Sequence, residues 1–197
     1  MEPRSWPQKS PRGSSEGRLT CSKKRYVEKM PTQIRAIVIT VSDACSRGER
    51  RDESGETLVK LLSAHGAEIL ETKIVSDDLE PLAEVLRAFA ERSDTNLIVT
   101  TGGTGLGPRD NTPEATLRVI ERQAPGIVEA MRNETLKHTP MAMISRGVCG
   151  IRSSTLIINL PGSPRAVRES FAVIEPVLKH AVALLAGQTS HSDARHT

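Results

Sequence analysis

Residues 96–105 read NLIVTTGGTG, an apolar run that ends in a cluster of glycines. Residues 96–101 are short, apolar and rich in β-branched side chains, as in a central strand that is buried on both faces of a parallel sheet. The glycines that follow let the backbone turn sharply and bring its N–H groups together, because no Cβ atom blocks the approach. The stretch therefore predicts a central strand whose carboxyl end meets an anion-binding turn.

Strand and helix patterns alternate on both sides of this stretch. Further strands are predicted at residues 34–41, 67–75 and 155–160. Helices are predicted at residues 54–65, 79–92, 112–122, 127–137 and 165–186, the third with Thr112 as N-cap and Pro113 at its first position. Strands separated by helices imply parallel βαβ units, so we expect a three-layer α/β/α domain with a mostly parallel central sheet.

Composition divides the chain into three parts. Residues 1–32 hold almost no apolar run and carry eight Lys or Arg against three Glu, so a disordered basic extension is expected there. Residues 33–187 are expected to form the folded domain, and residues 188–197 a flexible tail. Because the net charge of +3 comes from the extension, the domain itself is slightly acidic and we expect no nucleic-acid partner. A chain that began at Met30 would keep every predicted element.

Cysteine usage and hydropathy predict a cytoplasmic protein. Cys21, Cys45 and Cys149 show no paired spacing, as is typical of free thiols in a reducing compartment. No apolar stretch reaches the roughly 20 residues that a membrane span needs. The N-terminus also lacks the apolar core of a signal peptide, so no membrane association is expected.

Small and acidic residues follow each predicted strand, where ligands bind in open parallel sheets. The candidates are Ser42, Asp43, Asp52, Ser54 and Gly55 after the first strand, Asp77 and Asp78 after the second, Gly102, Gly103, Thr104, Gly105 and Asp110 after the third, and Asn159, Pro161 and Gly162 at the end of the last. The glycine turn can hold a phosphate near a helix N-terminus. Taken alone, however, it is equally explained as a tight turn without a ligand.

Asp77 and Asp110 suggest a magnesium site. They follow two strands that the fold can bring together, and Mg²⁺ is commonly held by one or two carboxylates with substrate phosphates. Asp110 is also explained by favourable charge at a helix start, and Asp77 by ordinary loop solvation. Ser145 and Arg146 form a further candidate anion site, because an arginine can bind a phosphate through two donors. A surface arginine beside a serine turn is the alternative.

Taken in order, these segments resemble the signature of the molybdopterin adenylyltransferases, which include bacterial MogA and the G domains of a plant protein and of animal gephyrin. The resemblance rests on residues 100–105, 108–110 and 112–116, on 41–43 with Asp52, Ser54 and Gly55, and on 144–146, 150–152 and 159–162. It covers residues 34–186 and implies the MogA/MoaB-like molybdopterin-binding fold.

The resemblance implies a reaction in which AMP passes from MgATP to the terminal phosphate of molybdopterin and pyrophosphate leaves. By motif alignment, Asp77 and Asp110 correspond to the catalytic, metal-binding aspartates of the family, and Ser145 to its substrate-contacting serine. Ser42, Asp43, Asp52, Ser54 and Gly55 would line or support the pterin side. The family also implies a homotrimer and transfer of the product to a molybdate-inserting protein of the MoeA type.

Two positions depart from the family pattern. Ser76 and Asp78 stand where the family commonly has Pro and Glu, which leaves Asp78 as an alternative to Asp77 for the functional carboxylate. Asn111 replaces a common Val. A non-catalytic carrier or scaffold for molybdopterin, as in a MoaB-like paralogue, is the alternative function.

Overall fold

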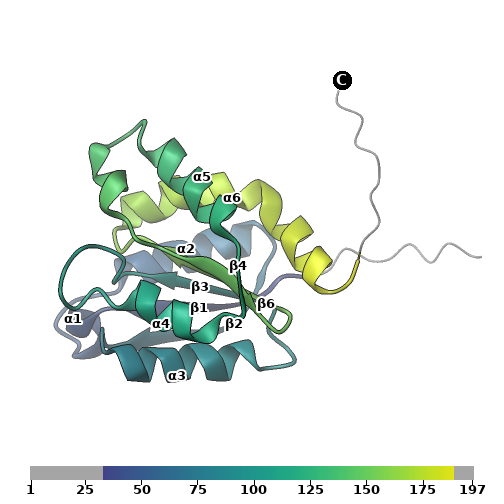
Figure 1. The fold of residues 1–197 in the computed structure, drawn as a ribbon. Coiled ribbons are helices and arrows are strands. Elements are labelled where there is room, and N and C mark those ends of the chain that lie inside the picture. The colour runs from purple at the N-terminus through teal and green to yellow at the C-terminus, as the bar shows by residue number, and fades with distance from the viewer. Residues whose placement is uncertain (1–32, 189–197) are drawn as a thin grey trace, which may run out of the picture. The chain divides into compact units, whose positions relative to one another are not determined.

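The computed structural model describes residues 33–188, so the predictions for residues 1–32 and for residues 189–197 of the tail lie outside the described part. The elements, labelled in Figure 1, are β1 Arg35–Val41, α1 Asp43–Ser46, α2 Glu53–Ala64, β2 Glu68–Val75, α3 Leu79–Ala90, β3 Leu97–Thr101, α4 Thr112–Val119, β4 Arg122–Gln123, α5 Pro125–Thr135, η1 Pro140–Ile144, β5 Cys149–Arg152, β6 Thr155–Leu160 and α6 Pro164–Leu185. Within residues 33–188, none of these helices has the length and apolar character to cross a membrane.

A six-stranded sheet in the order β2-β1-β3-β6-β5-β4 forms the middle layer. The first four strands of that order pair in parallel. At one edge of the sheet, β5 pairs antiparallel with β6, and β4 pairs antiparallel with β5. Figure 1 shows α2, α5 and α6 on one face of the sheet and α3 and α4 on the other. The predicted three-layer architecture with a mostly parallel sheet is thereby confirmed.

The central strands are apolar because they fill two cores at once. Successive side chains of a strand point to opposite faces, and on β1 Ala36 and Val38 join the core under α2 and α6 while Ile37 and Ile39 join the core over α3 and α4. β3 divides its side chains in the same way, with Val99 on the first face and Ile98 on the second.

The antiparallel edge was not predicted from the sequence. The helix predicted over residues 112–122 ends at Val119, and Ile120 adopts an extended conformation that leads into β4. β4 pairs with β5 opposite Gly150, where a Cβ atom would lie 2.8 Å from the carbonyl oxygen of Arg122. β4 and β5 have two and four residues and are too short to show an alternating hydrophobic pattern. The helical pattern of the preceding residues therefore led to the prediction of a helix as far as residue 122.

Thr112 is not the N-cap of α4, as was predicted, but its first residue. Asn111 occupies the cap position without a side-chain cap bond. The Thr112 hydroxyl donates instead to the carbonyl oxygen of Gly102 at 2.8 Å. The threonine therefore holds the glycine turn in place and does not satisfy the helix end.

The start of α2 leaves no room for a side chain at Gly55. A Cβ atom there would lie 2.1 Å from Oδ2 of Asp52 and 2.4 Å from Oγ1 of Thr40. Asp52 caps α2 by accepting from the Gly55 N–H at 2.8 Å and also accepts from the Thr40 hydroxyl at 2.6 Å. The glycine thus allows one carboxylate to tie the helix to the sheet.

Gly55→Ala is expected to lower the free energy of unfolding by roughly 2–3 kcal/mol, since it displaces the cap and leaves the Thr40 hydroxyl unpaired. Denaturant unfolding measures the change. The matched control is Gly126→Ala in α5, where no atom lies within 4 Å of the new Cβ. The control is expected to stabilise by about 0.5–1 kcal/mol through helix propensity. Equal stability of Gly55→Ala and the parent would contradict the packing argument.

Candidate functional site

The carboxyl ends of four parallel strands meet at one edge of the sheet, as predicted. Val41 of β1 pairs with Val75 of β2, and Thr101 of β3 pairs with Leu160 of β6. β1 lies between β2 and β3. The chain therefore passes from β1 to β2 on one side and then crosses back to β3 on the other side, so the strand order reverses between β1 and β3. A ligand crevice is expected outside such a reversal of strand order. The candidate residues that follow these strands therefore surround the reversal point.

The glycine turn sits at this reversal point and is held from three sides. Gly102 and Gly103 have φ values of +101° and +61°, and a Cβ on Gly102 would lie 2.3 Å from the carbonyl oxygen of Val41. Gly102 N–H donates to the Leu160 carbonyl at 3.2 Å, and Thr112 N–H donates to the Gly103 carbonyl at 3.1 Å. Only glycine tolerates this backbone so close to β1.

Three consecutive amides of the turn are free to bind a ligand. Within residues 33–188, the N–H groups of Gly103, Thr104 and Gly105 donate no hydrogen bond to the protein. All three residues line the same cavity. Successive unpaired N–H groups of this kind form an anion-binding concavity. The geometry thus favours the phosphate-binding interpretation of the turn over a turn without a ligand.

Asp43 and Asp77 are joined by reciprocal hydrogen bonds. The N–H of Asp43 donates to Oδ2 of Asp77 at 2.7 Å, and the N–H of Asp77 donates to Oδ1 of Asp43 at 3.0 Å. Oδ1 of Asp77 lies 3.3 Å from the position of a Cβ on Gly103, so this carboxylate borders the glycine turn. Asp78 is about half exposed and accepts from Ser76 and Arg109. The structure therefore favours Asp77 over Asp78 as the functional carboxylate.

The two joined aspartates have opposite electrostatic surroundings. Partial burial, together with the neighbouring charges of Asp43 and Asp110, raises the pKa of the Asp77 carboxyl above its ordinary value. Hydrogen bonds from the Arg109 guanidinium and from the Asp77 amide lower the pKa of Asp43. Asp77 is thus a carboxylate that its surroundings make costly to ionise, as is common at functional sites. A bound cation would relieve that cost.

Asp110 lies across the loop from the glycine turn and is folded back onto it. Its Oδ2 accepts from the Gly107 N–H at 2.7 Å and lies 2.9 Å from the position of a Cβ on Gly105. Arg146 spans the same loop, because its guanidinium donates to the carbonyl oxygens of Gly105 and Asp110 and to the carboxylate of Glu114. Arg146 therefore fixes the loop and does not line the cavity, which is a role other than the predicted anion contact.

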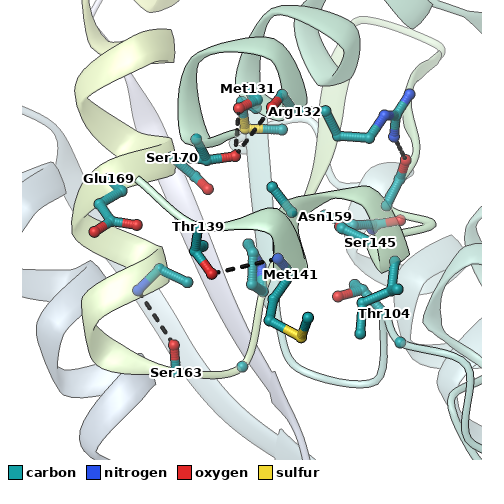
Figure 2. Close-up of a pocket in the computed structure, with 18 of the residues that line it drawn as sticks. Thr104, Met131, Arg132, Thr139, Met141, Ser145, Asn159, Ser163, Glu169 and Ser170 are labelled. Atoms are coloured by element: carbon teal, nitrogen blue, oxygen red, sulfur yellow. Dashed lines mark hydrogen bonds between the residues drawn. The ribbon is translucent and has the colours of Figure 1, made fainter. Parts of the chain in front are cut away.

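A cavity of about 560 Å³ opens beside the turn. Eight of the predicted site residues line it: Gly103, Thr104, Gly105, Asp110, Ser145, Asn159, Pro161 and Gly162. Figure 2 shows Ser163, Glu169 and Ser170 of the α6 side facing Thr104, Ser145 and Asn159. The cavity therefore joins the turn to the N-terminus of the longest helix in the described part.

The sequence did not identify the second wall of this cavity. It is formed by residues of α5, η1 and α6, among them Arg132, Thr139, Met141, Ser163, Arg165 and Glu169. One signal was available: Ser163 follows a strand, and its hydroxyl accepts from the Ala166 N–H as an N-cap. A helix that starts with a capping serine directly after a central strand is expected to point its positive end at the ligand.

Asn159 was predicted to bind substrate, but both groups of its side-chain amide already bond to the protein. Its Oδ1 accepts from the Val148 N–H at 3.0 Å, and its Nδ2 donates to the hydroxyls of Thr100 and Thr116 at 3.0 and 2.9 Å. These bonds join β6, β3 and α4 and tie in the segment before β5 under the cavity floor. Asn159 thus shapes the cavity, and both protons of its amide nitrogen are already used.

Asn159→Ala is expected to cost roughly 2–4 kcal/mol of unfolding free energy, because the buried hydroxyls of Thr100 and Thr116 and the part-buried N–H of Val148 lose their hydrogen bonds. Thermal or denaturant unfolding gives the value. Asn133→Ala, at an exposed position of α5, is the control and should change stability little. If both variants proved equally stable, water would have to satisfy the three partners in place of Asn159.

The residues after β1 support the site and do not line the main cavity. Ser42 caps α1 by accepting from the Cys45 N–H, and Ser54 donates to Asp52. Asp52 and Gly55 border a second hollow between α2 and β2, apart from the glycine turn. In the described residues they hold α1 and α2 against the sheet, which agrees with the supporting role predicted for them, and contact with the pterin stays a prediction.

Two features bear on metal binding and on nucleophilic chemistry. Within residues 33–188, no three His, Cys, Asp or Glu side chains form a metal-binding group. The carboxylates of Asp77 and Asp110 beside free N–H groups still fit Mg²⁺, because that ion takes few protein ligands and relies on phosphates and water. Cys45 and Cys149 are buried, and burial raises the pKa of the Cys149 thiol to about 12, as expected for unreactive thiols.

Fold and site together define a doubly wound α/β domain with an anion-binding turn at its strand-order reversal. Residues 37–180 match the family described as "Probable molybdopterin binding domain", and the chain belongs to that family. It is similar to the molybdopterin adenylyltransferase of Helicobacter pylori strain J99, with 40% identity over 152 residues, or 76% of this chain and 86% of the relative. The resemblance drawn from the motifs is thereby confirmed.

A solved structure and a further relative support the same assignment. The crystal structure of the molybdopterin biosynthesis enzyme MoaB from Thermus thermophilus shares 46% identity and a TM-score of 0.75, and covers 79% of this chain and 98% of that one. The Drosophila melanogaster "Molybdenum cofactor synthesis protein cinnamon" is 41% identical over 78% of this chain. This chain spans about a quarter (26%) of that relative's length.

Proposed function

We propose that the chain is a molybdopterin adenylyltransferase. An oxygen of the terminal phosphate of molybdopterin attacks the α-phosphorus of ATP, the bond from that phosphorus to the bridging oxygen breaks, and pyrophosphate leaves. The observation that carries this proposal is the row of free N–H groups at Gly103, Thr104 and Gly105, which line a cavity together with Asp110. The Asp77 carboxylate lies outside that lining but borders the turn at Gly103. A relative of this activity at 40% identity supports the choice of substrates.

Adenylyl transfer of this kind requires no protein nucleophile. The enzyme accelerates it by positioning the two substrates and by neutralising the charge of their phosphates. In the proposed complex the turn amides bind phosphate oxygens. The N-terminus of α6, capped by Ser163, favours a second anionic group across the cavity. Ser145 lines the side of the cavity that faces α6 and would contact the substrate, as the family alignment implies.

Mg²⁺ is part of the proposal. Asp77 and Asp110 would hold the ion that accompanies ATP, and this ion would offset the charge that collects on the phosphates. Asp77 suits the role because burial and neighbouring carboxylates already disfavour its unpaired charge. The proposal therefore keeps the predicted assignment of Asp77 and Asp110 to metal binding and catalysis.

The deciding experiment mixes the purified protein with molybdopterin, ATP and Mg²⁺ and measures the two products. Adenylyl-molybdopterin and pyrophosphate are expected to form in equal amounts. Replacing ATP by an analogue with a methylene group between the α- and β-phosphates should abolish both products while leaving binding intact. Binding of molybdopterin without any adenylylated product would instead identify the carrier function. The 46% identity to a MoaB structure makes that the second candidate.

The assembly and location expected of the family complete the proposal. It includes a homotrimer, transfer of adenylyl-molybdopterin to a MoeA-type protein and a cytoplasmic site of action, all of which the family resemblance implies. Light scattering of the purified full chain measures the oligomeric state. A monomer would remove the trimer from the proposal and leave the reaction itself untouched.

A further inference from the structure

Arg109 connects three strand ends of the sheet through one side chain. It lies in the loop between β3 and α4, and its Nε and Nη2 donate to Oδ2 and Oδ1 of Asp43 at 2.7 and 2.9 Å. Nη2 also donates to Oδ1 of Asp78 at 3.1 Å. The loop after β3 is thereby fastened to the segments that follow β1 and β2.

Stability alone accounts poorly for this arrangement. The Arg109 side chain is 55% exposed, and ion pairs at such positions contribute little to folding. The pair is nevertheless bidentate, a geometry that fixes orientation as well as distance. The exposed two-point pairs Arg47–Glu49 and Arg51–Glu56 join residues two and five positions apart, whereas this pair joins residues 66 positions apart. It therefore fixes two distant segments relative to each other.

The partner that Arg109 holds is the residue that orients Asp77. Asp43 offers its N–H to the Asp77 carboxylate and its own carboxylate to the Asp77 N–H. From the other side, Asn111 donates to the Asp77 carbonyl oxygen at 2.8 Å. Asp77 therefore has its carboxylate set by α1 and its backbone set by the loop of Arg109, and a shift of that loop would displace both.

Arg109 also stands directly before Asp110 in the chain. Its attachment to Asp43 therefore limits the freedom of the loop that carries Asp110, in addition to the bonds from Arg146. The two proposed metal-binding carboxylates come from different strand ends, and Arg109 joins those ends together with Asn111. We propose that Arg109 is a positioning residue, which acts through Asp43 to hold Asp77 and Asp110 at the separation that Mg²⁺ and ATP require; this inference rests on the proposed function.

The test is a double-mutant cycle on Arg109→Gln and Asp43→Asn. Each single variant is expected to lower kcat by about 10–100-fold, because displacement of catalytic groups by about 1 Å costs up to about 100-fold. If Arg109 acts through Asp43, the double variant loses no more than the worse single variant. Arg109→Lys, which keeps the charge but not the two-point contact, should recover only a small part of the loss.

Mg²⁺-dependent ATP binding, measured by calorimetry on the full chain, provides a readout apart from turnover. Arg109→Gln should require several-fold more Mg²⁺ for half-saturation with ATP, whereas its melting temperature should stay close to that of the parent. The control is Arg118→Gln, which removes an exposed ion pair between α4 and Glu80 outside the cavity lining. It should change neither ATP binding nor turnover.

Each outcome decides a different point. Independent, additive losses in the cycle, or an unchanged Mg²⁺ requirement in Arg109→Gln, would overturn the positioning role. A parent protein that binds MgATP but forms no adenylyl-molybdopterin would overturn the proposed reaction alone, since the cycle can then be completed on ATP binding. A parent protein that binds no MgATP would overturn both.

Discussion

Asp110→Asn is expected to lower turnover by about 100–1,000-fold, the usual loss when one electrostatic contact to a developing charge is removed. The substitution keeps the shape of the side chain, and its amide oxygen can still accept from the Gly107 N–H at the position where Oδ2 now accepts at 2.7 Å. The loop should therefore remain folded while the charge for the metal is lost. Steady-state formation of adenylyl-molybdopterin and the melting temperature measure the two effects.

A charge elsewhere on the surface provides the comparison for Asp110. Asp94→Asn, in the turn before β3, removes a carboxylate that pairs with Arg92 and lies outside the cavity lining. It should leave turnover unchanged. If Asp110→Asn were as active as Asp94→Asn, Asp110 would not be a metal ligand, and the interpretation of its charge as helix-start electrostatics would stand.

The strand ends were predictable because parallel sheets impose a simple rule. Once residues 34–41 and 96–101 are recognised as strands buried on both faces, their carboxyl ends must lie at the same edge. The placement of Asp77 and of the glycine turn beside β1 follows from that rule. Helix bounds were less predictable, because the period of a helix such as residues 112–122 does not show where the backbone begins to pair with a strand.

The contacts of individual side chains could not be predicted from the sequence. Asn159 and Arg146 both belong to the expected motifs, but only the structure shows that both amide protons of Asn159 are bonded within the protein and that Arg146 holds a loop. The wall formed by α5 and η1 was missed for a similar reason. Its residues are brought to the cavity by packing of distant segments, for which a sequence pattern has no period.

Asp77→Asn is expected to lower turnover while the fold becomes slightly more stable. Burial and the neighbouring charges of Asp43 and Asp110 raise the pKa of the Asp77 carboxyl, so its ionised form is disfavoured in the folded protein. An asparagine at this position removes that cost and can still accept from the Asp43 N–H, the bond that Oδ2 now makes at 2.7 Å. Residues kept for function at the expense of stability commonly behave in this way.

Asp78→Asn is the matched variant, since it changes the adjacent residue in the same manner. Asp78 is 53% exposed on its side chain and N-caps α3 without a side-chain cap bond, so this variant should keep most of its turnover and gain no stability. Turnover and melting temperature of the two variants can be compared in one buffer at neutral pH. The reverse pattern, a large loss in Asp78→Asn and little change in Asp77→Asn, would move the functional carboxylate to Asp78. It would also mean that the burial of Asp77 serves only the junction with Asp43, because a buried carboxylate that can be neutralised without loss of activity has no part in holding the metal.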